Sequence, residues 1–214
     1  MVKHRDVCKS TALSSYKTGS EKGYHLITLV TNKRVRIFAS KELAKIATEA
    51  VLFIEKKRGF RLRGFIVMPD HIHIISEPTR SLHCVILEIK KLISLMSISY
   101  LSIHNRSLLT SIESPNHGRN KALFQLWKKA YHHARILTEE KLTEALRYLY
   151  EHPVRSGICG TVFDYEFSDL HRHLGPGGRT DPERASLFHP KKPGASVGPA
   201  RKIARANSGP ASVS

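Results

Sequence analysis

The sequence has few cysteines and no long run of apolar residues. Its three cysteines, Cys8, Cys84 and Cys159, are widely spaced, which excludes a CxxC metal site and a disulfide framework and fits a reducing cytoplasm. The N-terminal segment lacks the apolar stretch of an export signal, and no segment approaches the roughly 18 uncharged apolar residues of a membrane span. We therefore expect a cytoplasmic protein without a membrane-spanning segment.

Acidic residues are also scarce, with 18 against 35 lysines and arginines, so the formal net charge is +17. A surplus of this size favours polyanions, because each phosphate that a basic side chain neutralises releases condensed counterions. Nucleic acid is the leading candidate partner. The alternative is a ribosome-associated or merely cationic protein.

Composition divides the 214 residues into a body and a tail. In residues 176–214, glycine, proline and serine make up 16 of 39 residues, with seven basic residues and two acidic ones. Such a segment buries too little apolar surface to offset the entropy lost on ordering, so we expect a disordered basic tail. Residues 1–175 have the length of a single domain.

The body mixes strand and helix patterns. Strand patterns are found in four segments, residues 24–31, 60–68, 71–76 and 123–137. Helical periodicity is found in three segments, residues 41–58, 82–103 and 139–152. Pro69 and Asp70 form the turn of a predicted hairpin, Ser40 and Thr138 are expected N-caps, and Pro153 is expected to end the last helix. The mixture predicts an α+β fold.

The second strand of the hairpin carries two histidines at alternate positions, His71 and His73. Alternate side chains of a strand share one face, so both imidazoles point the same way while Ile72 and Ile74 enter the core. Two neutral imidazoles on a rigid strand supply half of a metal coordination shell, and a third ligand must come from elsewhere. The other explanation is a half-exposed strand with polar alternation, in a chain that has 13 histidines.

The last predicted helix carries a possible nucleophile beside its apolar stripe. At about 100° per residue, the stripe consists of Leu142, Ala145, Leu146 and Leu149. Tyr148 and His152 lie four residues apart on the same flank of that stripe, whereas Tyr150 points about 160° away from His152. Only one of the two tyrosines can therefore share a site with that histidine.

A phenol with a pKa of about 10 is a poor nucleophile at neutral pH, so Tyr148 needs a divalent ion or a base nearby. A metal ion would also polarise a phosphoryl oxygen, and with a basic surface the implied target is a phosphodiester. The competing interpretation makes Tyr148 an interfacial core residue and His152 a partner of the negative end of the helix dipole.

Several ordered blocks of the sequence resemble the HUH-type single-tyrosine transposases, especially the REP-associated tyrosine transposases and their IS200-like relatives. The resemblance runs from about Tyr24 to Gly175. The blocks are YHLITLVTNKR, GFIVMPDHIHII, LWKKAY, ALRYLYEHPVRSGI and DYEFSDLHRHLG. It implies a ferredoxin-like or RRM-like antiparallel sheet packed with helices.

The resemblance also implies an activity, which is cleavage and rejoining of single-stranded DNA near a hairpin through a 5′-phosphotyrosine. His71 and His73 match the metal-binding histidines of that family, Tyr148 its nucleophile and His152 its third ligand, with Mg²⁺ or Mn²⁺ as the ion. Relatives usually carry Asn or Gln at the last position. Imidazole is a softer ligand than an amide oxygen, so the histidine tilts the preference from Mg²⁺ toward Mn²⁺ or other transition metals. The enzyme would act as a monomer or a homodimer.

Basic and aromatic residues flank these blocks and are candidates for DNA contacts. The basic candidates are Arg63, Lys128, Lys129, Arg135, Arg155 and Arg172. Trp127 or Tyr131 could stack an unpaired base, although Trp127 fits the core better. Two other functions stay open: a domesticated protein that binds DNA hairpins without cutting them, and an RNA-binding RRM-like protein, which the absence of an RNP1-like string disfavours.

Overall fold

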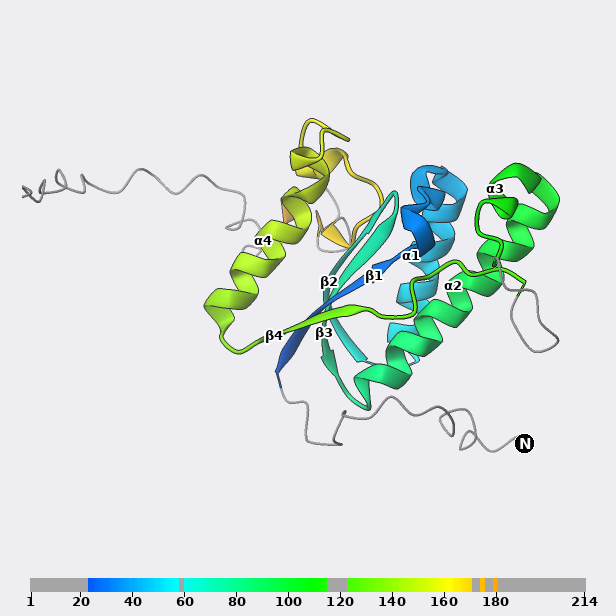
Figure 1. Cartoon of the computed structure of the whole chain (residues 1–214). Coiled ribbons are helices and arrows are strands. Elements are labelled where there is room, and N and C mark those ends of the chain that lie inside the picture. Colours follow the sequence, from blue (N-terminus) through cyan, green and yellow to red (C-terminus); the bar gives the residue numbers. More distant parts are fainter. Residues whose placement is uncertain (1–22, 58–59, 115–122, 171–173, 176–178, 181–214) are drawn as a thin grey trace, which may run out of the picture.

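The computed structural model describes residues 23–57, 60–114, 123–170, 174–175 and 179–180. A twisted sheet separates two layers of helices, with α4 on one face and α1 and α2 on the other (Figure 1). Within these residues, every helix is too short or too polar to span a membrane.

The sheet has four antiparallel strands, β1 (Tyr24–Val30), β2 (Phe60–Met68), β3 (His71–Pro78) and β4 (His132–Ile136). Their order is β2-β3-β1-β4, with β2 and β3 joined as the predicted hairpin. Together with the helices between the strands, the chain follows the β-α-β-β-α-β succession of ferredoxin-like folds. The predicted α+β class with an antiparallel sheet is confirmed.

The main core lies between the sheet and helices α1 (Lys41–Lys56) and α2 (Leu82–His104). Alternation along the strands sends Ile72 and Ile74 of β3 into this core, as the sequence predicts, and both are almost fully buried. The short helix α3 (Arg106–Thr110) follows α2. Single 3₁₀ turns cover Asn32–Arg34 (η1), Ile37–Ala39 (η2) and Val162–Asp164 (η3).

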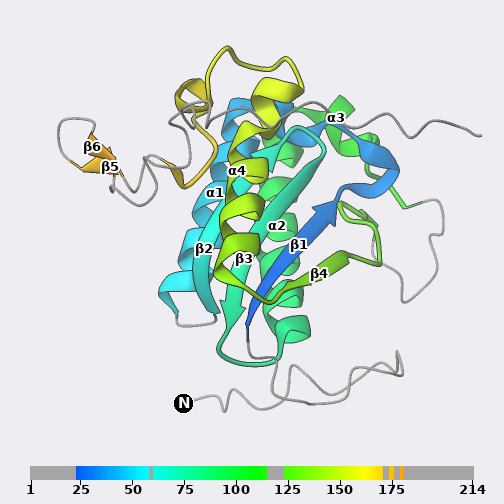
Figure 2. The same cartoon turned by 90° about the vertical axis from the view of Figure 1, so that its left-hand side faces the viewer.

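Helix α4 (Glu139–Arg155) covers β2 and β3 on the opposite face, as the view in Figure 2 shows. Leu142, Leu146 and Leu149 of the predicted stripe are buried there. Gly64 of β2 faces the helix, and a Cβ added there would lie 2.6 Å from Leu146 Cδ2 and 3.1 Å from the Tyr150 hydroxyl. A glycine at this position lets helix and sheet pack at this distance.

The residues after α4 cover the outer edge of β2. Val67 N donates to Phe167 O at 2.8 Å, and Ser168 forms an antiparallel bridge with Ile66. Asp169, which is buried, accepts hydrogen bonds from Phe65 N at 2.8 Å and from the Tyr150 hydroxyl at 2.9 Å. This return segment therefore ties α4 to the sheet from a second side.

Three details differ from the sequence-based predictions. Pro153 lies inside α4 and is buried, and the helix continues to Arg155, because a proline in the last turn removes only one hydrogen bond. Of the predicted strand 123–137, only His132–Ile136 forms a strand paired along its length. The preceding residues join the sheet through a single bridge, from Trp127 to Thr31. Ser40 precedes α1 without capping it, since its hydroxyl donates to Glu42.

The predicted tail lies outside the described residues, apart from the two-residue strand β6 (Arg179–Thr180), which pairs with β5 (Leu174–Gly175). The boundary after residue 175 stays a prediction. Among the described cysteines, Cys159 is a free thiol and Cys84 is disulfide-bonded.

Candidate active site

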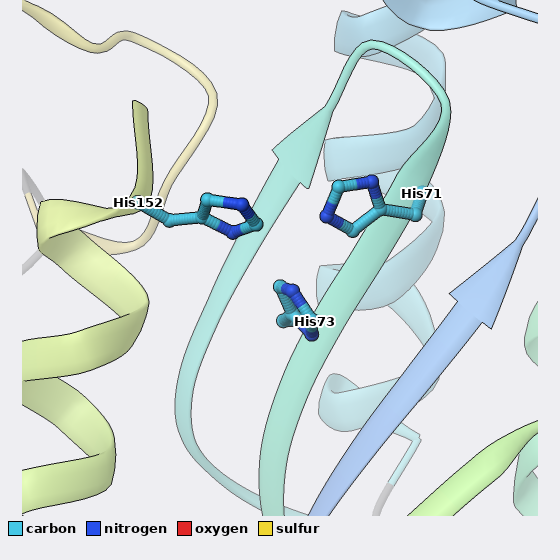
Figure 3. Close-up of side chains that lie close together, drawn as sticks. All are labelled: His71, His73 and His152. Atoms are coloured by element: carbon cyan, nitrogen blue, oxygen red, sulfur yellow. The ribbon is translucent and has the colours of Figure 1, made fainter. Parts of the chain in front are cut away.

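Three imidazoles from two elements meet at the end of the sheet near the β2–β3 turn (Figure 3). His71 and His73 project from β3 on the face that α4 covers, and His152 reaches them from the last turn of α4. The ring centroids are 4.7 Å apart for His71 and His73, and each lies 5.1 Å from that of His152. One ligand nitrogen from each ring falls within 4.8 Å of the others. We call these three residues the triad.

Two neighbouring side chains orient the β3 imidazoles. His71 Nδ1 donates to Asp70 Oδ1 at 2.6 Å, and His73 Nδ1 shares a hydrogen bond of 2.8 Å with the Thr28 hydroxyl of β1. Both contacts engage Nδ1, so Nε2 of each ring is left free to face the other two imidazoles of the triad. Metal-binding histidines in proteins are commonly fixed in this way by a carboxylate or another oxygen.

Asp70 is itself held by the loop that follows β1. Arg34 donates to Asp70 Oδ2 at 3.0 Å, and Thr31 N donates to the Asp70 carbonyl at 3.0 Å. Burial alone would raise the pKa of Asp70, but the hydrogen bonds from His71 and Arg34 outweigh it and lower that pKa. Asp70 therefore stays ionised and keeps accepting the His71 N–H.

The triad fits a divalent metal ion of the borderline class. Burial, followed by the neighbouring His71 and His152, lowers the pKa of His73 to about 3, and burial and His71 also lower the pKa of His152. Both imidazoles are therefore neutral at physiological pH, the form that binds a metal. His152 Nδ1 is buried and has no hydrogen-bond partner within the described structure, which leaves it available as a ligand.

Tyr148 lies one helical turn before His152, and the centroids of the two rings are 6.0 Å apart. Half of the Tyr148 surface is exposed, so its ring is accessible from solvent. The Arg155 guanidinium covers the ring at 4.1 Å from its centroid and donates to the Tyr148 carbonyl at 2.7 Å. One chain thus presents a phenol, a cation and the triad on one surface.

Tyr150 has a structural environment instead. It is 1% exposed, and its hydroxyl donates to Asp169 beneath α4. The helical prediction that only one of the two tyrosines shares a site with His152 agrees with this arrangement.

The basic residues proposed to contact DNA are dispersed. Arg155 lies at the site, and Lys128 and Lys129 are exposed beside the end of β1. Arg63 pairs with Glu77, six residues beyond His71 on β3 and thus about 20 Å along the strand. Arg135 pairs in register with His25, whose side chain lies on the face of the sheet opposite to the triad, so the Arg135 side chain also points away from the triad. Arg172 lies outside the described residues.

Trp127 belongs to the core, as the sequence favours. It is 6% exposed, packs against Phe38, and donates from Nε1 to the Lys90 carbonyl at 3.1 Å.

The sequence did not predict Asp70, Thr28 and Arg34 as supports of the triad. For Asp70 a signal existed, because an acid directly before a candidate ligand is placed to orient it. Thr28 and Arg34 have no local signal.

Comparison with known proteins gives the family of this chain. The family model described as "Transposase IS200 like" matches residues 20–151. This match covers more than half of the chain, so the protein belongs to the IS200-like transposase family. No curated protein matches the sequence.

Two of the solved structures that are similar to this chain are transposases by description. One is described as a REP-associated tyrosine transposase bound to a REP hairpin; it is 18% identical, with a TM-score of 0.55, and the match covers 90% of this chain and all of that one. At this identity the likeness establishes the fold. The other, a putative transposase from Deinococcus radiodurans, is 17% identical, with a TM-score of 0.41 and coverage of 64% of this chain and 95% of that one. That score is too low to carry an argument.

Proposed function

We propose that this transposase cuts and rejoins single-stranded DNA beside a hairpin, with Tyr148 as the nucleophile and a divalent metal ion at the triad. The observation that carries the proposal is the position of the exposed Tyr148 ring, 6.0 Å from the His152 ring of the triad. Membership of the IS200-like family supports the transposase activity. Hairpin DNA is supported as the substrate because a structural relative is described as bound to a REP hairpin.

In the cleavage step, the Tyr148 oxygen forms a bond to the scissile phosphorus and the bond from phosphorus to the 3′ oxygen breaks. The phenol proton passes to solvent, which the half-exposed position of Tyr148 allows, and the leaving 3′ oxygen takes up a proton. The products are a 5′-phosphotyrosine and a free 3′-hydroxyl. The bond energy is retained, so attack by another 3′-hydroxyl rejoins a strand without ATP.

Arg155 would serve this step from its position over the Tyr148 ring. Its guanidinium fixes the ring through the stacking contact and places a positive charge where the scissile phosphate must approach. The ion pair with Glu151, at 3.4 Å, keeps the guanidinium over the same turn of α4.

His71, His73 and His152 would hold the metal ion, which would polarise a phosphoryl oxygen as a Lewis acid. Three imidazole nitrogens suit Mn²⁺ and other transition metals better than Mg²⁺, which prefers oxygen ligands. We therefore expect Mn²⁺ to support activity at lower concentration than Mg²⁺.

The test is formation of a covalent complex with a 3′-labelled, hairpin-bearing oligonucleotide in the presence of Mn²⁺, followed on a denaturing gel. We expect an adduct with the wild type and with Tyr150→Phe, the matched control two residues away, and none with Tyr148→Phe. An adduct that survives Tyr148→Phe would refute the assignment. Tight hairpin binding without any wild-type adduct would instead favour the non-catalytic alternative.

A further inference from the structure

Two segments beside the triad carry a concentration of cationic side chains. We call it the basic rim, and it consists of Lys33, Arg34, Arg36, Lys128 and Lys129. The first three follow β1 and the last two precede β4, and main-chain hydrogen bonds join the segments. Asn32 N donates to Leu126 O at 2.7 Å, and Lys128 N donates to Val30 O at 2.9 Å. Figure 2 shows the loop after β1 and the segment leading to β4 at the same end of the sheet.

The charge of the basic rim is not balanced by nearby acids on its own segments. Residues 31–40 and 123–136 contain no aspartate or glutamate. All five side chains are exposed, and within the described part of the chain only that of Arg34 takes part in an ion pair. Exposed like charges repel one another, so a surface of this kind favours an anionic partner.

The basic rim is linked to the triad through Arg34. Arg34 lies 3.0 Å from Asp70 Oδ2, and Asp70 Oδ1 lies 2.6 Å from His71 Nδ1, so two contacts connect the rim to a triad imidazole. The backbone of the loop is also constrained, because Lys33 and Arg34 have positive φ angles of 52° and 54°. Left-handed conformations are unfavourable at residues other than glycine and are kept where the surrounding structure holds them.

We propose that the basic rim binds the phosphodiester backbone of the single strand that flanks the hairpin and enters the triad. This inference rests on the proposed function and adds the surface that positions the substrate. The single-stranded flank is favoured over the hairpin stem because the scissile phosphate must lie at Tyr148 and the triad. The nucleotides next to it are then the first to meet Arg34 and its neighbours.

The salt dependence of binding tests the proposal. Each phosphate contact on single-stranded DNA contributes about 0.7 to the slope of log affinity against log salt concentration. Replacing Lys33, Arg36, Lys128 and Lys129 with glutamine should therefore reduce the slope by about 2.8. Arg34 is kept, because it also supports Asp70. All measurements use the full chain with Tyr148→Phe, so that DNA is bound and not cut.

Two oligonucleotides and one control variant complete the experiment. The expected loss of slope appears with a hairpin that carries the single-stranded flank and is absent with the same hairpin lacking it. The control replaces Lys45 and Lys56, two exposed lysines of α1 on the other side of the sheet, and should leave both slopes unchanged. An unchanged slope in the rim variant, an equal loss with both DNAs, or an equal loss in the control would each overturn the proposal. Because no cleavage is measured, failure of the proposed chemistry would be seen separately, as a missing adduct with the wild type.

Discussion

Asp70 gives the sharpest quantitative test of how the triad is built. Its carboxylate accepts from His71 Nδ1 at 2.6 Å through one oxygen and from Arg34 at 3.0 Å through the other. Removing an oxygen partner of a ligating histidine typically weakens metal binding about 10–100-fold, which corresponds to about 1.4–2.7 kcal/mol. Asp70→Asn keeps an acceptor and loses the charge, so we expect about 10-fold weaker Mn²⁺ binding. Asp70→Ala removes both the acceptor and the charge, so we expect about 100-fold weaker Mn²⁺ binding.

Isothermal titration of the metal-free protein with Mn²⁺ measures this effect directly. Glu77→Gln is the matched control, because Glu77 is also a paired carboxylate on β3 but lies at the far end of the strand. It should bind Mn²⁺ with wild-type affinity. The reasoning is refuted if Asp70→Ala retains wild-type affinity while its circular dichroism shows an intact fold, since Asp70 would then not orient the ligand.

Two further predictions concern α4 and the buried imidazole. Gly64→Ala puts a methyl group 2.6 Å from Leu146 Cδ2, so we expect a loss of about 1–3 kcal/mol in the free energy of unfolding, measured by urea titration. Because α4 carries His152 and Tyr148, we also expect a lower yield of the covalent adduct on the denaturing gel. An unchanged adduct yield would contradict the link between the Gly64 contact and the site. The folded pKa of His73 is lowered to about 3 from 6.5, mainly by burial, so the stability that it contributes is complete above about pH 6.5 and is lost as the pH falls toward 3. Between pH 7.5 and pH 4.5 the wild type should therefore lose more unfolding free energy than His73→Gln, and an equal loss would show that His73 does not cause it.

The sequence predicts each half of the site because each half is local. Two-residue alternation places His71 and His73 on one face of a strand, and helical periodicity places Tyr148 and His152 on one flank of a helix. Whether the strand histidines and the helix residues come together depends on how α4 crosses the sheet. This crossing follows from the Gly64 contact and from the buried hydrogen bonds of Asp169, which are tertiary and have no pattern in the sequence. The family resemblance supplied this step.

The supports of the triad could not be predicted for the same reason. Thr28 contacts His73 because β1 pairs with β3 in the register that places them opposite each other, and a shift of one residue would turn Thr28 to the other face. Pro153 illustrates the opposite error. The rule that proline ends a helix is local, whereas Pro153 is buried by the tertiary fold and lies in the last turn, where only one hydrogen bond is lost.

The central claim is that the Tyr148 oxygen attacks the scissile phosphate. Protease digestion of the wild-type adduct, followed by mass spectrometry of the nucleotide-linked peptide, identifies the attachment residue. We expect a 5′-linked nucleotide on Tyr148 of the α4 peptide, and none on Tyr150 in the same peptide. A nucleotide attached to any other residue, or linked through its 3′ end, would contradict the account.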